Sequence, residues 1–98
     1  MPARKPVDHS KPYTPAPYSK YDIYALKALQ EGNASPHQQQ RALAWIIHTA
    51  ARTYDLTYHP GGSEGDRDTA FAAGKQFVGQ QVVKLVNYDA SLLNQLKE

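Results

Sequence analysis

The segment from Asp66 to Val86, DRDTAFAAGKQFVGQQVVKLV, constrains the fold more than any other part of the chain. It opens with acids, carries an apolar stripe at helical spacing, and places Gly74 and Gly79 inside the helix that this pattern predicts. Each interior glycine costs a helix roughly 1 kcal/mol relative to alanine. We therefore predict a packing helix whose missing side chains let another backbone approach closely.

The residues expected to pack against another helix are apolar or glycine, and most of them share one helical stripe. The expected packing residues are Phe71, Gly74, Val78 and Gly79, and the stripe continues through Val82 and Leu85. Asp66 or Asp68 is expected to cap this helix, because a carboxylate accepts hydrogen bonds from the free amides of the first turn. The same charge meets the positive end of the helix dipole.

A second helix is predicted from Pro36 to about Tyr54. Ser35 is the expected cap, Pro36 takes the first helical position, and Gln38 completes a capping box. Its expected buried face consists of Leu43, Ile46, Ile47, Ala50 and Tyr54. We expect this helix and the glycine helix to form an antiparallel pair.

Two shorter helices complete the prediction. The first opens at Ser19, with Asp22 three residues later as a variant capping box, and ends at Gly32. The last is capped by Asp89. The expected fold is all-α: a small bundle of three to four helices over residues 19–98, with almost no strand.

Residues 1–18 read as an extended N-terminal arm. They contain five prolines and two tyrosines, a composition that excludes a helix interior or a central strand. Residues 1–20 carry four basic groups against one acid, a net charge of +3, whereas the remainder carries seven against eight, a net charge of −1. The arm is therefore the basic part of the chain, either as a free tail or as a tether that lies along a partner.

Length and composition narrow the class of protein. The 98 residues allow one domain, and so small a body is often helped by oligomerisation, so a homo-oligomer is expected. There is no cysteine, which excludes disulfides and thiolate metal sites. No run of residues approaches the length of a membrane span, and the N-terminus lacks the apolar stretch of a signal peptide. We expect a soluble cytoplasmic protein without membrane partners.

No pattern indicates a metal site. The four histidines are His9, His37, His48 and His59. No two of them stand three or four residues apart, as helical ligand pairs do. Glu64, Asp66 and Asp68 match the start of a calcium loop. The match fails at Thr69, where the turn needs glycine, and at Lys75, where a bidentate glutamate belongs.

No pattern indicates catalysis either. The loop 61–65, GGSEG, precedes a helix, but it lacks the following Lys-Ser/Thr of a phosphate loop and leads into aspartates that repel phosphate. No nucleophile occupies a recognisable elbow. We expect no catalytic residue, cofactor or metal, and therefore a protein that is not an enzyme.

Binding surfaces remain. Gln39 and Arg41 at the start of the second helix follow the short turn 32–35, which is compatible with a helix-turn-helix that reads base edges. The alternative is a solvated helix face. Lys75 could meet a phosphate if DNA is bound. Candidate contacts in the arm, whatever the partner, are Arg4, Lys5, Lys11, Tyr13 and Tyr18.

The pattern Thr69-Ala70-Phe71, Gly74-Lys75 and Val78-Gly79 resembles a family of small helical proteins of tailed phages that has a Bordetella podophage member. The segments ALAWII (42–47), TYDLTYHPG (53–61) and PYTPAPYSKYD (12–22) resemble the same family. The resemblance covers most of the chain. It implies a place in the head-morphogenesis and DNA-packaging gene neighbourhood, and it supplies no catalytic residues.

Two functions follow as expectations. The first is a packaging accessory that resembles a small terminase subunit and binds phage DNA for the motor. The second is a structural component of the virion at the head, portal or neck, which docks through its N-terminal arm. The partner is then phage DNA or a larger phage assembly such as the portal, the large terminase or the capsid.

Overall fold

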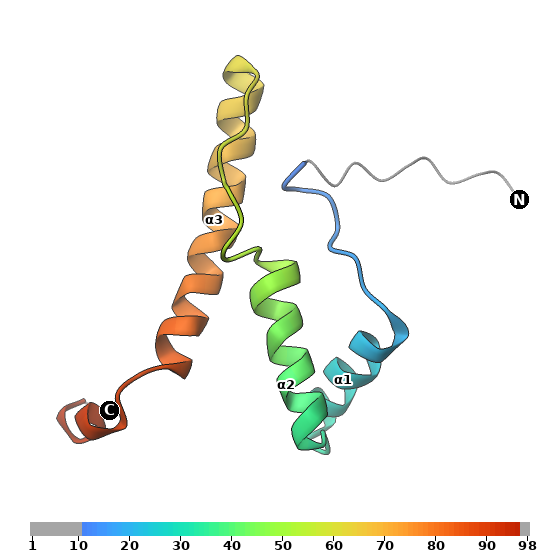
Figure 1. The fold of residues 1–98 in the computed structure, drawn as a ribbon, viewed down its shortest axis with the longest axis vertical. Coiled ribbons are helices and arrows are strands. Elements are labelled where there is room, and N and C mark those ends of the chain that lie inside the picture. Colours follow the sequence, from blue (N-terminus) through green and yellow to red (C-terminus); the bar gives the residue numbers. More distant parts are fainter. Residues whose placement is uncertain (1–10, 97–98) are drawn as a thin grey trace, which may run out of the picture.

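The computed structural model describes residues 11–96, and within that range the fold is all-α without a strand. Figure 1 shows the helices in chain order. They are α1 (Lys20–Glu31), α2 (Pro36–Ala44), which continues directly into η1 (Trp45–Ala50), α3 (Gly62–Val86) and the short η2 (Ala90–Gln95). The predicted all-α class is confirmed.

The ends of α1 and α2 follow the predicted local chemistry. Ser19 and Asp22 form a capping box, and Ser35 and Gln38 form a second one, so each helix start satisfies its first backbone donors through side chains. Gly32 ends α1 with a left-handed φ of 77°, a conformation that favours glycine. These short helices pack against each other across the turn between them.

The second helix is shorter than predicted. After Ala44 the hydrogen bonding widens to a π-helical turn, η1, in which the amide of Ala51 donates to Ile46 O at 2.9 Å. Arg52 then adopts a positive φ of 51° and ends the helix. The predicted extension to Tyr54 is therefore wrong, because the wider turn places Ile47 and Ala51 in the core and leaves Tyr54 exposed.

The start of α3 also differs from the prediction. The helix begins at Gly62, with Gly61 as its cap at a φ of 121°, and no side chain caps it. Neither Asp66 nor Asp68 is the cap. Asp68 lies one and a half turns inside the helix, where it is only 5% exposed and pairs with Lys11.

The loop that precedes α3 folds back along its first turns, as Figure 1 shows. The amide of His59 donates to Thr69 Oγ1 at 2.8 Å, and Gln76 Nε2 donates to Asp55 O at 3.1 Å. A Cβ atom on Gly65 would lie 2.6 Å from Pro60 O, so the loop backbone touches the helix there. This close approach at Gly65 was not predicted.

Gly74 and Gly79, the two glycines inside the predicted packing helix, have opposite surroundings. A Cβ atom on Gly79 would collide with Thr53 Oγ1 and would lie 2.9 Å from Ala51 Cβ, which is the close approach expected. A Cβ atom on Gly74 would meet nothing within 4 Å, so the prediction of a packing role for Gly74 within this chain is wrong. The reason is the direction from which η1 arrives, since it meets the face of α3 that carries Gly79.

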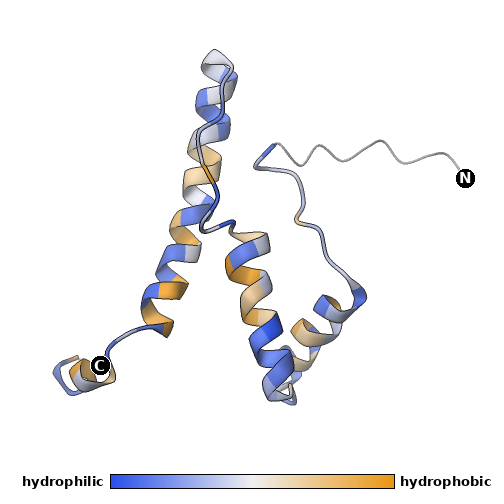
Figure 2. Ribbon diagram, in the orientation of Figure 1, coloured by the Kyte–Doolittle hydropathy of each residue, from blue (hydrophilic) through white to orange (hydrophobic). Residues whose placement is uncertain are grey.

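Most of the predicted stripe on α3 is consequently uncovered. Phe71 is 49% exposed, Val78 is 59% exposed and Leu85 is 69% exposed. The C-terminal half of α3 stands apart from α2, and several of its positions are apolar in Figure 2. The two helices run in opposite directions, but α3 meets the preceding helix through η1 and not along its length.

The core is correspondingly small. Its buried apolar residues are Ala25, Ala42, Ile47 and Ala51, and Pro12 of the arm is fully buried as well. The Cα radius of gyration is 16.9 Å, whereas a compact domain of about 100 residues has about 13 Å. The chain is thus an open arrangement of helices with little apolar surface buried.

Two smaller features complete the fold. Asp89 caps η2, as predicted, by accepting from the amide of Ser91 at 2.9 Å. Among residues 11–96, no helix combines the length and the apolar character that crossing a membrane requires.

Candidate partner-binding surface

The described part of the arm, residues 11–18, lies against the helices of its own chain. Pro12 is buried, and its carbonyl oxygen accepts a hydrogen bond from Lys75 Nζ at 2.6 Å. Lys11 Nζ lies 3.1 Å from Asp68 Oδ2, and Trp45 Nε1 donates to Pro17 O at 3.0 Å. This part of the arm is therefore held at several points by α3 and η1.

The surroundings of the two lysines at this contact shift their pKa values in opposite directions. The hydrogen bond and the charge of Asp68 raise the pKa of Lys11, because both favour its protonated form. Burial lowers the pKa of Lys75, and the nearby charge of Arg52 lowers it further. Lys11 therefore holds the arm on α3 through an ion pair, whereas Lys75 holds it through a hydrogen bond to the arm backbone.

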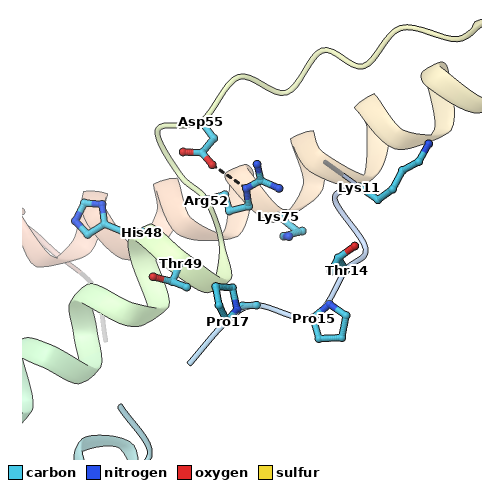
Figure 3. Close-up of a pocket in the computed structure, with 10 residues that line it drawn as sticks. Lys11, Thr14, Pro15, Pro17, His48, Thr49, Arg52, Asp55 and Lys75 are labelled. Atoms are coloured by element: carbon cyan, nitrogen blue, oxygen red, sulfur yellow. Dashed lines mark hydrogen bonds and ion pairs between the residues drawn. The ribbon is translucent and has the colours of Figure 1, made fainter. Parts of the chain in front are cut away.

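An open groove of about 340 Å³ lies between the arm, η1 and α3 (Figure 3). Its walls include His48, Arg52 and Lys75, together with the prolines of the arm. Arg52 is paired with Asp55 at 2.7 Å, which offsets its charge. Within the described residues, no group of three or more histidine or acidic side chains is placed to hold a metal ion. The groove is open, and its lining mixes polar side chains with the prolines of the arm.

The side chains at the start of α2 that were expected to read DNA form hydrogen bonds and an ion pair with nearby residues of the same chain. Arg41 Nε lies 2.9 Å from Asp22 Oδ1, and a second guanidinium nitrogen of Arg41 donates to Ser19 Oγ at 3.2 Å. Gln39 Nε2 donates to Ala34 O at 3.0 Å. Hydrogen bonding from the Ser19 amide lowers the pKa of Asp22, and Arg41 lowers it further. These groups join α1 to α2.

Tyrosine supplies most of the exposed aromatic side chains of the described surface. Six of the seven tyrosines are more than half exposed: Tyr13, Tyr18, Tyr21, Tyr24, Tyr54 and Tyr58. Tyr18, Tyr21 and Tyr24 follow one another at three-residue intervals at the start of α1, and we call them the tyrosine surface. The rings of Tyr21 and Tyr24 meet edge to face, with centroids 6.3 Å apart.

Two cations flank the tyrosine surface. Lys20 Nζ lies 5.3 Å from the centre of the Tyr21 ring, and the guanidinium carbon of Arg41 lies 5.6 Å from the same centre. Cations at this distance are attracted to the ring face and help to orient it. The result is an ordered aromatic and cationic patch on α1.

The sequence-based candidates divide into three groups. Arg4 and Lys5 lie outside the described residues. Lys11, Gln39, Arg41 and Lys75 each bond within the chain. Tyr13 and Tyr18 are exposed, and the Tyr13 ring meets Phe71 edge to face with centroids 6.3 Å apart.

Tyr21 and Tyr24 were missed as candidates. Their signal was present, because Tyr18, Tyr21 and Tyr24 recur every third residue and so fall close together once Tyr21 and Tyr24 are on a helix. The cation partners of Tyr21 were only partly foreseeable. Lys20 is its neighbour in sequence, but Arg41 reaches it only because α2 packs on α1.

Comparison with known proteins gives no match. No family model fits the sequence, and no curated protein or solved structure is significantly similar to it. The tyrosine surface and the exposed face of α3 are therefore the features on which a function can be based.

Proposed function

We propose that the protein is a non-enzymatic assembly protein that binds a larger protein partner through its tyrosine surface. In the phage setting that the resemblance implies, it is a component of the head, portal or neck. One observation carries this proposal: most tyrosines point outward while the described core consists of three alanines and one isoleucine. A chain that places its large apolar groups outside gains most of its burial from a partner.

The chemistry of the tyrosine surface suits protein recognition. Tyrosine and arginine are enriched where protein interfaces are most deeply buried, since they combine apolar area with a polar tip. Tyr21 and Tyr24 orient each other, and Lys20 with Arg41 fixes the first ring. Such a preordered patch loses little side-chain freedom on binding.

A DNA-packaging accessory resembling a small terminase subunit is the second candidate. The packing of α1 on α2 across the turn 32–35 favours it, because two helices joined by a short turn are the frame of a helix-turn-helix. Against it, Gln38, Gln39 and Arg41 are already bonded to neighbours within the frame. DNA would have to displace those bonds to use these side chains.

The test is mass spectrometry of purified virions of the encoding phage. The assembly role requires the protein at a fixed copy number per particle. The double variant Tyr21→Ala/Tyr24→Ala should reduce its incorporation at least tenfold. The matched control is Tyr54→Ala/Tyr58→Ala, which removes two somewhat more exposed rings elsewhere and should leave incorporation unchanged.

Two results would overturn the proposal. One is absence of the protein from particles that have completed packaging. The other is equal loss of incorporation in both double variants. Absence from particles combined with DNA binding that weakens steeply with salt would support the packaging accessory instead, because phosphate contacts release counterions.

A further inference from the structure

The exposed side of α3 has the spacing of a helix that pairs with another helix. Phe71, Gly74, Val78, Gln81 and Leu85 alternate intervals of three and four residues, and we call them the outer face. This alternation places apolar positions along one seam, as in a two-helix coiled coil. The outer face is largely exposed in the single chain, although the ring of Tyr13 meets Phe71 at one end of it, and it includes Gly74 with open space around it.

We propose that the outer face is the interface with a second copy of this chain, with the two α3 helices antiparallel about a two-fold axis. The two central layers then each pair a valine with a glycine. Val78 of each copy lies over Gly74 of the other, and Phe71 lies opposite Gln81 of the other. The gap at Gly74 is filled by the second copy, which accounts for a glycine where the single chain needs none.

The charges along α3 favour this orientation. Residues 62–68 carry three acids and one arginine, a net charge of −2, whereas residues 69–86 carry two lysines and no acid, a net charge of +2. Antiparallel pairing sets the acidic end of each helix beside the basic end of the other. Lys84 comes within about two residues, or roughly 3 Å along the axis, of Asp66 of the second copy. A parallel pair would place like charges together.

The available area is sufficient for a weak dimer. The exposed apolar groups of this side of α3 are Phe71, Phe77, Val78 and Leu85, each about half to two-thirds exposed. Together with flanking polar stems, they would bury on the order of 1,000 Å² over both copies, near the lower bound for a specific interface. This surface does not include the tyrosine surface on α1, so the inference stands independently of the proposed function.

Sedimentation equilibrium of the full chain tests the dimer. We expect the average mass to rise from one copy to two between about 1 μM and about 1 mM protein, the range of weak complexes. Val78→Glu should raise the dissociation constant at least tenfold, because it places an unpaired charge in the central layer. Gln80→Glu is the matched control, since it adds the same charge on the opposite side of α3 and should change the constant less than twofold.

Disulfide cross-linking tests the orientation, because the natural chain has no cysteine to interfere. Phe77→Cys lies beside the proposed axis and should form a covalent dimer under mild oxidation. Leu85→Cys should not, because the two copies of that position would be roughly 27 Å apart in an antiparallel pair. Each cysteine variant leaves most of the outer face unchanged, so the cross-linking experiment still tests the dimer if Val78→Glu fails to fold.

Three outcomes would overturn the proposal. The first is a single-copy mass over the whole concentration range. The second is a dimer that Val78→Glu and Gln80→Glu weaken equally. The third is cross-linking through Leu85→Cys and not through Phe77→Cys, which would mean a parallel pair. A monomer whose outer face becomes protected only with a different protein also contradicts self-association.

Discussion

The two sides of α3 each carry a glycine, but one side is buried within the chain and the other is exposed. The inner face presents Gly65, Asp68 and Gly79 to the loop, the arm and η1, and all three are buried. The outer face presents Phe71, Gly74 and Val78, and a side chain added at Gly74 would meet nothing. A glycine in an apolar helix thus indicates close approach only where a second element arrives.

The element that arrives at the inner face is fixed by its own hydrogen bonds. Thr53, only 3% exposed, donates through its hydroxyl to Ile47 O at 2.6 Å, and its amide donates to the same oxygen at 3.1 Å. This bond closes the end of η1 and aims Thr53 at Gly79. The contact is therefore specified by the irregular end of a helix and not by apolar pattern alone.

The largest expected effect is at the inner glycine. Gly79→Ala should lower the free energy of unfolding by about 2 kcal/mol, because the new methyl group overpacks against Thr53 and Ala51. Urea denaturation followed by circular dichroism measures it. An unchanged or higher stability would show that the two faces do not differ as described.

The next effect tests the hydrogen bond that positions the contact. Thr53→Val keeps the size of the side chain but removes the donor to Ile47 O, and should cost about 1 kcal/mol. Thr53→Ser retains the donor and is the matched control for the bond. If Thr53→Val is as stable as the natural protein in the same denaturation assay, the amide of Thr53 alone holds the end of η1.

The outer glycine should respond in the opposite direction. Gly74→Ala should raise the stability of the single chain by just under 1 kcal/mol, because the helix gains propensity and nothing is displaced. The measurement requires protein dilute enough to be monomeric. A loss of stability at that dilution would mean that Gly74 is covered within the chain, which would erase the contrast between the faces.

The smallest effect concerns the arm at the inner face. Asp68 raises the pKa of Lys11 in the folded state, so the ion pair stabilises the fold fully below the ordinary lysine pKa of about 10.5. That contribution is lost as the pH rises through the raised value. The stability difference between the natural protein and Lys11→Gln should therefore shrink as the pH is raised above the ordinary lysine pKa of about 10.5. A difference that stays constant over this range would show that Lys11 acts through packing and not through its charge.

Local sequence was a good guide where the chemistry is local. Ser19 with Asp22, Ser35 with Gln38, Gly32 and Asp89 all act as the caps predicted for them. Each satisfies backbone groups within a few residues, so no distant partner is needed to predict it. The candidate partner contacts could not be predicted in this way, because Lys75 and Lys11 each bond to a residue more than fifty positions away in the chain.

The sequence by itself determined that the body after the arm is all-helical, where α1, α2 and η2 begin, and where α1 ends. Only the tertiary structure decided which glycine is a contact, that α2 widens into η1, that α3 begins at Gly62, and that residues 11–18 of the arm lie against the helices of their own chain. The physical reason is the distance along the chain over which each interaction acts. Caps and propensities act over one helical turn, whereas the choice of a buried face depends on where a distant segment arrives and what volume it fills.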